Sequence, residues 1–191
     1  AKFADYPTEQ KSKYEIYWLF GWPYETSAFM ARMVFSQMFE KLPNLRIITH
    51  HLGAMAPFFV DRIGYGMDQF GSRTSDEDYE GLLKRMKKRP LDFFRMFYGD
   101  TSVNGSPSAI RCGLDFFGVD HVLFGTDCVS PAGTQSMLEV FHLYDPVWKL
   151  LTPEASRMVR LENHARIFDE AKRRTRAWEK ANVPASRLES A

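Results

Sequence analysis

The chain of 191 residues is 45% hydrophobic and 26% charged, a composition typical of a globular protein that excludes a collagen-like, disordered or disulfide-built chain. Its 25 Lys and Arg residues are balanced by 24 Asp and Glu residues, so the net charge does not support a nucleic-acid partner. No apolar run is long enough to span a membrane, and two cysteines indicate a reduced compartment. We therefore expect a cytoplasmic protein that binds neither nucleic acid nor a membrane.

Helical patterns dominate the first part of the chain. Apolar residues at helical spacing follow Pro23, which suits a first helical turn, and they predict a helix over about 23–42. The β-branched run 45–50 predicts a strand. Two more helices are expected, over about 55–70 and 77–88, the latter with an N-cap among Thr74, Ser75 and Asp76.

The second part alternates strands and helices. Residues 94–98 and 121–125 read as strands. Between them, a helix is expected from Ser106 or Pro107 to Phe117, with Gly118 as its stop signal. Further helices are expected over about 133–143, 146–151, 153–161 and 165–181, followed by a frayed tail.

Polar residues lie at or just after the end of each predicted strand: His50 and His51 at the first, Asp100 at the second and Asp127 at the third. Strands separated by helices pair in parallel, and the carboxyl ends of parallel strands form sites. Imidazole and carboxylate groups can bind a divalent metal or transfer protons. Because side chains alternate along a regular strand, only one of the two histidines should face the site, and spacing alone does not identify it.

Each of these residues also has a structural interpretation. A histidine at a strand end often serves only as a hydrogen-bonding group. Asp127 could cap the helix that follows it, and Asp100 could be a turn residue. The residue types alone leave both interpretations open.

Several segments, taken in order, resemble one known family. FEKLPNLRIITHHLGAMAPFFVDRI resembles the sixth strand and helix of amidohydrolase-related proteins of the aminocarboxymuconate-semialdehyde decarboxylase type. FYGDTS, VLFGTDCVSP and LENHARIF resemble the seventh strand, the eighth strand and the closing segment. The resemblance implies an α/β fold, a (β/α)8 TIM barrel, of which this chain is the C-terminal portion with about strands 6–8. Residues 1–168 would then belong to one barrel domain, and 169–191 would form a charged terminal helix and tail.

The resemblance also assigns roles at the strand ends. The spacing between the histidine and Pro57 aligns His51, rather than His50, with the family histidine that moves protons. Asp127 aligns with a metal ligand on the eighth strand. Asp100, one strand away, is expected to orient a ligand.

Two further residues are implied to contact the substrate. Arg62 matches an arginine that, in some decarboxylases, reaches a neighbouring subunit's pocket and pairs with a substrate carboxylate. A surface salt bridge is the alternative for Arg62. Trp18 aligns with an aromatic residue near the substrate pocket. The implied partners are a small carboxylated molecule and a second copy of the chain in a homo-oligomer, a dimer.

The implied activity of the complete protein is non-oxidative decarboxylation that depends on a divalent metal, zinc first and manganese second. Hydrolysis of a lactone or amide, or hydration, is the alternative, and a non-catalytic truncated fragment is a further one. The family's His-x-His of strand one and the histidine of strand five have no counterpart in this chain, and a catalytic zinc needs three protein ligands. A partial barrel is also expected to leave two open sheet edges that can pair with another chain.

Overall fold

A three-stranded parallel sheet lies at the centre of the computed structural model, which describes residues 4–73, 76–127 and 141–182. The strands β1 (Ile48–Thr49), β2 (Tyr98–Asp100) and β3 (Val122–Leu123) lie in the order β1-β2-β3. Ile48 is aligned with Tyr98, and Asp100 with Leu123. The expected α/β class and parallel strand pairing are confirmed, and all three carboxyl ends lie at one edge of the sheet.

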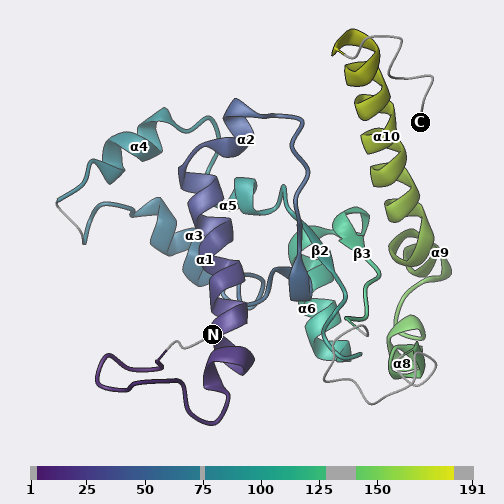
Figure 1. Cartoon of the computed structure of the whole chain (residues 1–191), viewed down its shortest axis with the longest axis horizontal. Helices are drawn as coiled ribbons and strands as arrows, with labels where there is room; N and C mark the ends of the chain where they lie inside the picture. Colours follow the sequence, from purple (N-terminus) through teal and green to yellow (C-terminus); the bar gives the residue numbers. More distant parts are fainter. Residues whose placement is uncertain (1–3, 74–75, 128–140, 183–191) are drawn as a thin grey trace.

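Helical segments surround this sheet (Figure 1). In chain order they are η1 (Tyr17–Gly21), α1 (Trp22–Phe35), α2 (Met38–Lys41), η2 (His50–Gly53), α3 (Val60–Asp68), α4 (Tyr79–Arg85), α5 (Pro90–Phe94), α6 (Pro107–Phe117), η3 (Val119–His121), α8 (Asp145–Trp148), α9 (Pro153–Arg157), η4 (Met158–Glu162) and α10 (Asn163–Asn182). In Figure 1, α1 to α5 lie to one side of the strands, and α8 to α10 lie to the other.

The helix α6 matches its prediction at both ends. The Ser106 side chain accepts a hydrogen bond from the backbone N–H of Ala109, and Pro107 occupies the first turn. Gly118 follows the helix with φ +82, a conformation that favours glycine. Local signals therefore define this helix completely.

The bounds of the predicted strand 94–98 are wrong: Phe94 is the last residue of α5, and the strand, β2, begins only at Tyr98. Pro90 begins that helix, and Leu91 and Phe94 are buried on it. A short apolar run does not distinguish a strand from a buried helix, so the sequence pattern was ambiguous here.

Other boundaries also differ from expectation. The predicted helix 23–42 is interrupted at Gln37, whose φ of +58 separates α1 from α2. The predicted helix 55–70 starts only at Val60, and α4 is capped by Asp78, whose side chain accepts from the N–H of Gly81. Thr74 and Ser75, most of the expected helix 133–143 and the tail lie outside the described residues. The charged C-terminal helix is present as α10.

The core holds the sheet against α6 and the turn after β1. A Cβ on Gly99 would lie 3.0 Å from Leu52 Cα and 3.1 Å from Phe117 Cε2. A side chain at this position would force Leu52 or Phe117 to move by a few tenths of an ångström, so Gly99 allows β2 to lie directly against both groups. The core next to the strand ends, where the candidate site lies, is therefore closely packed.

The outer edge of β3 is covered rather than open. The Asn163 side chain donates to the carbonyl of Val122 at 2.7 Å, and the N–H of Phe124 donates to the carbonyl of Val159 at 3.0 Å. The His164 Nε2 contacts the carbonyl of Phe124 at 3.0 Å. The expectation of two open edges is therefore corrected: the segment from η4 into α10 covers one of them.

No helix in the described parts of the chain combines the length and hydropathy that a membrane span requires.

Candidate active site

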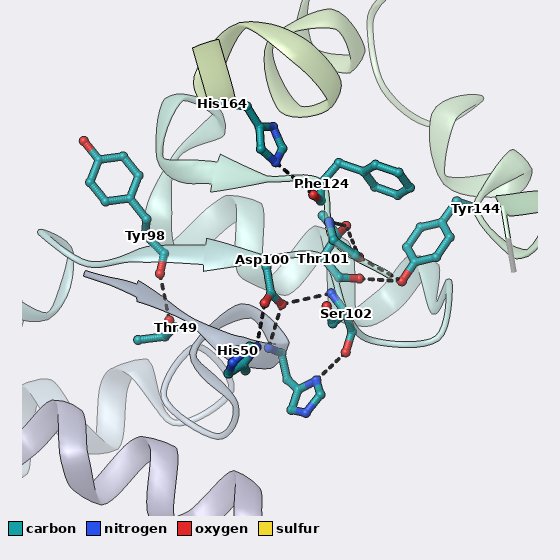
Figure 2. A network of polar contacts seen from close by, with 11 residues as sticks. Thr49, His50, Tyr98, Asp100, Thr101, Ser102, Phe124, Tyr144 and His164 are labelled. Carbon is teal, nitrogen blue, oxygen red and sulfur yellow. Dashed lines mark hydrogen bonds and ion pairs between the residues drawn. The ribbon is translucent and has the colours of Figure 1, made fainter. Parts of the chain in front are cut away.

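The Asp100 carboxylate connects the ends of β1 and β2. Its Oδ1 accepts the backbone N–H of His51 at 2.9 Å and that of Ser102 at 3.1 Å, while Oδ2 lies 2.9 Å from Nδ1 of His50. Figure 2 shows these contacts converging on Asp100. The side chain is only 14% exposed, so hydrogen bonds replace its lost hydration. Asp100 therefore holds the backbone of His51 and the ring of His50, and its expected role in orienting a ligand stays a prediction.

The backbone turns sharply at His51. The strand ends at Thr49, and His51, Leu52 and Ala54 all have positive φ values, of 53, 52 and 56. Such conformations cost about 1–3 kcal/mol for residues other than glycine and cluster at functional sites. The strand therefore does not continue regularly through the two histidines, and the turn, rather than strand alternation, sets their directions.

The imidazole of His51 is held by the carbonyl of Ser102, which contacts Nδ1. A carbonyl oxygen only accepts hydrogen bonds, so Nδ1 carries the proton and Nε2 is the nitrogen left to exchange protons. His51 is half-buried, whereas the His50 side chain is 77% exposed. The two rings lie 6.0 Å apart between centroids.

Asp127 follows a firmly held segment after β3. The Thr101 hydroxyl lies 3.0 Å from the carbonyl of Gly125 and 3.1 Å from its N–H. The Tyr144 hydroxyl donates to the carbonyl of Thr101 at 2.7 Å (Figure 2). Asp127 itself is exposed and has a φ of +57, so it shares with His51 a left-handed backbone.

A pocket of about 250 Å³ adjoins His51, and its other lining residues are mostly apolar. Cys112 of α6 contributes to its wall, and burial raises the pKa of that thiol, with a smaller contribution from Asp115. The thiol is therefore a poor nucleophile, and the imidazole of His51 is the better candidate for proton transfer in this pocket.

The two substrate-contacting candidates lie elsewhere. Arg62 on α3 is exposed and lines a separate hollow of about 630 Å³ between α1 and α3, whose lining shares no residue with the His51 pocket. Trp18 on η1 is 44% exposed and packs edge-on against Trp22. The structure thus brings Asp100 to the histidines, and it does not place Arg62 in the same hollow as His51.

The donor set fits a metal only in part. Asp127 offers a carboxylate, yet the described residues contain no group of three His, Cys, Asp or Glu side chains that could hold an ion. A catalytic metal usually has three protein ligands. The described residues therefore do not form a metal site by themselves.

Sequence reasoning missed the residues that support the candidates. Ser102, Thr101 and Tyr144 make the contacts described above, and Thr101 and Tyr144 are fully buried. The polar run after β2 is the signal in the sequence that could have identified Thr101 and Ser102. Nothing near Tyr144 in the sequence indicates its contact, because it lies 43 residues from Thr101.

Residues 7–169 match the family model described as "Amidohydrolase". The match covers most of the chain, and the chain belongs to this family. The earlier resemblance is therefore confirmed at the level of the family.

Individual relatives are decarboxylases. The chain is 29% identical over 125 residues to the 2-amino-3-carboxymuconate-6-semialdehyde decarboxylase of Dictyostelium discoideum, covering 65% of this chain and 32% of that protein. It is similar to the solved 5-carboxyvanillate decarboxylase of Sphingomonas paucimobilis, with 25% identity, a TM-score of 0.63, and 85% and 44% of the two chains covered.

A dihydroxybenzoic acid decarboxylase from a Polaromonas species, solved with bound manganese, shares the fold at 21% identity and a TM-score of 0.59, with 81% and 45% covered. The chain thus spans about a third of the curated relative's length and under half of each solved structure.

Proposed function

We propose that this chain forms the strand 6–8 portion, residues 1–168, of a TIM-barrel amidohydrolase that removes CO₂ from a small carboxylated aromatic molecule without oxidation. The observation that carries the proposal is that Asp100 binds the backbone of His51 at the edge where the three parallel strands end, and Asp127 follows the third of these strands. Support comes from the decarboxylases among its relatives, which include one acting on 5-carboxyvanillate. Residues 169–191 would add only a terminal helix and tail.

His51 is the proposed proton donor. When the bond between the ring carbon and the carboxylate breaks, CO₂ leaves and the electron pair stays on the carbon, which must then take a proton. Ser102 holds the Nδ1–H of His51, so the ring would act as an imidazolium: Nε2 would take a proton from solvent and then give it to the carbon. Asp100 holds the His51 backbone at 2.9 Å and fixes the direction of the ring.

A divalent ion is proposed as the cofactor of the complete protein, with Asp127 as one ligand. A relative of the same fold holds manganese, which supports manganese at least as well as the zinc expected from the sequence. The remaining ligands would come from residues beyond those described, because the described residues form no group of three.

Arg62 and Trp18 are the proposed substrate contacts. Arg62 is exposed on α3 and separate from the His51 pocket, which suits an arginine that serves the pocket of a second copy in a homodimer. A planar guanidinium pairs with a carboxylate through two hydrogen bonds. Trp18 would contribute an aromatic surface for the ring of the substrate.

The test is assay of the complete protein, loaded with manganese, on a panel of hydroxylated benzoic acids, with released CO₂ trapped and the aromatic product identified. We expect equimolar CO₂ and decarboxylated product. His51→Ala should lower kcat by about 10²–10⁴-fold, the range for loss of a positioned acid–base group. A hydroxylated or hydrolysed product without CO₂ would overturn the proposal in favour of the hydrolase or hydratase alternative.

Arg62→Lys is the matched test of the arginine. It keeps the charge and loses the planar two-bond geometry, so KM for the carboxylate should rise with little change in the metal content. Unchanged KM would assign Arg62 to the surface.

A further inference from the structure

We infer that Tyr144 is a positioning residue, whose buried hydroxyl sets the placement of His51 relative to Asp127. The inference rests on the proposed function, because that function makes His51 and Asp127 the residues whose relative placement matters. The geometric claim does not need turnover to be tested.

The Thr101–Ser102 dipeptide supports both candidate residues. On one side, the carbonyl of Ser102 holds Nδ1 of His51. On the other side, the Thr101 hydroxyl contacts both the N–H and the carbonyl of Gly125, at 3.1 and 3.0 Å. Asp127 lies two residues after Gly125. A shift of this dipeptide therefore moves the imidazole and the carboxylate relative to one another.

Backbone pairing alone does not hold this dipeptide. The β2–β3 pairing ends at Asp100 and Leu123, with one further bond from the N–H of Thr101 to the carbonyl of Leu123 at 2.9 Å. Beyond that bond, the hydroxyl of Thr101, rather than its backbone, makes the hydrogen bonds to Gly125. The carbonyl of Thr101 accepts the N–H of Val103 at 2.6 Å, a contact within the same turn, so only a donor from elsewhere in the chain can tie this carbonyl to another element.

Tyr144 supplies that donor. Its hydroxyl lies 2.7 Å from the carbonyl of Thr101 and 3.4 Å from that of Gly125, so one group contacts both strand ends. The side chain is fully buried, and its ring packs against Phe124 and Trp148. The aromatic packing fixes the ring, and the ring fixes the hydroxyl.

Gly125 completes the arrangement. A Cβ at this position would lie 3.2 Å from Cβ of Asp100 and 3.1 Å from the Ser102 hydroxyl. The absence of a side chain lets the segment before Asp127 lie directly against Asp100, which itself holds the backbone of His51. The hydroxyl of Tyr144 therefore stabilises the one junction that all three candidates share.

Tyr144→Phe is the test variant, because it keeps the ring and removes the hydroxyl. Tyr98→Phe is the matched control: Tyr98 is also buried, and its hydroxyl makes no hydrogen bond to any residue that the structure describes. Both variants are made in the 191-residue chain with ¹⁵N labelling. The readouts are the imidazole nitrogen resonances of His51 and the hydrogen exchange of the Gly125 amide.

In the wild-type chain we expect His51 to be protonated at Nδ1 alone when neutral. In Tyr144→Phe, we expect a mixture of the two tautomers. We also expect the exchange rate of the Gly125 amide to increase at least 10-fold more than that of the Ile110 amide in α6, which reports general destabilisation. His121, whose Nδ1 contacts the carbonyls of Arg95 and Phe97, should keep its tautomer. Tyr98→Phe should leave His51 and Gly125 unchanged.

An unchanged His51 tautomer together with unchanged Gly125 exchange in Tyr144→Phe would overturn the inference, as would equal effects in the two variants. If Tyr144→Phe does not fold, Thr101→Val tests the same junction by removing the hydroxyl that contacts Gly125. A folded Thr101→Val with wild-type values at His51 and Gly125 would likewise reject it. Since no readout involves CO₂ release, a failed decarboxylase assay and a failed positioning claim remain separate results.

Discussion

One carboxylate oxygen of Asp100 accepts the backbone N–H of His51, 49 residues earlier in the chain, at 2.9 Å. This single contact connects the end of β1 with the end of β2, and it holds a residue whose backbone has an unfavourable left-handed conformation. The strain at His51 is thus offset by a charged acceptor placed by a different strand.

Replacing Asp100 with alanine leaves the N–H groups of His51 and Ser102 without that acceptor. We expect a loss of about 1–3 kcal/mol in the free energy of unfolding, the usual cost of an unsatisfied buried group, measured by urea denaturation. Asp100→Asn keeps an oxygen that can accept from both backbone groups, so it should lose less than half as much. Equal losses in the two variants would mean that the charge, rather than the acceptor geometry, matters.

Gly99→Ala should destabilise the fold by about 1–3 kcal/mol, the range for overpacking a filled core, because the new methyl group would meet Leu52 and Phe117 at 3.0–3.1 Å. The control is Gly66→Ala in α3, where a Cβ meets nothing within 4 Å. Alanine favours a helix over glycine by up to about 1 kcal/mol, so that variant should be neutral or slightly stabilised. Thermal unfolding of both variants checks the contrast, and an equally neutral Gly99→Ala would show that β2 can shift to make room.

Asn163→Ala removes the side-chain donor that covers the outer edge of β3. The amide donates to the carbonyls of Val119 and Val122 at 2.8 and 2.7 Å, and the residue is almost fully buried. We expect a loss of about 2–3 kcal/mol, the upper range for leaving buried acceptors unpaired. Asn182→Ala, which removes an exposed contact at the end of α10, should cost far less. Similar values for the two would contradict a covering role for Asn163.

Stability should decrease at alkaline pH through Tyr144. Burial raises the pKa of its phenol above the ordinary value of 10.0, and the negative charges of Asp100 and Asp127 add to this effect. A raised pKa in the folded state means that the stabilisation is complete below the pKa of the unfolded state and is lost as pH rises through the folded one. The free energy of unfolding should therefore fall above about pH 10, and it should fall less steeply in Tyr144→Phe. Parallel slopes for the two chains would remove Tyr144 as the cause.

The features that could be predicted from the sequence are those encoded locally. Ser106, Pro107 and Gly118 determine α6 because a cap, a fixed φ and a left-handed stop act within one turn of the residue concerned. The parallel pairing of the strands followed from the alternation of helices and strands. The gathering of His51 and Asp100 at one edge followed from parallel pairing and needed no knowledge of side chains.

Features set by distant contacts could not be predicted. No glycine at position 51 indicates the left-handed turn in the sequence. The turn is stabilised by contacts with Asp100 and Ser102, which lie at the end of another strand. Phe94 reads equally well as strand or helix until the packing of α5 is known. The contact of Tyr144 with Thr101 depends on where the chain returns after Asp127, which no short motif records.

The asymmetric cover of the sheet has a consequence for assembly. At β3, the segment 159–164 already engages the backbone of Val122 and Phe124. At β1, the register turns the N–H and carbonyl of Ile48 away from β2, and they have no hydrogen-bond partner within the described part of the chain. An additional strand can therefore pair with the sheet at only one of its two edges without rearrangement. Beside Ile48 it can form hydrogen bonds with the backbone N–H and carbonyl of that residue, whereas beside Val122 it must first displace the side chain of Asn163.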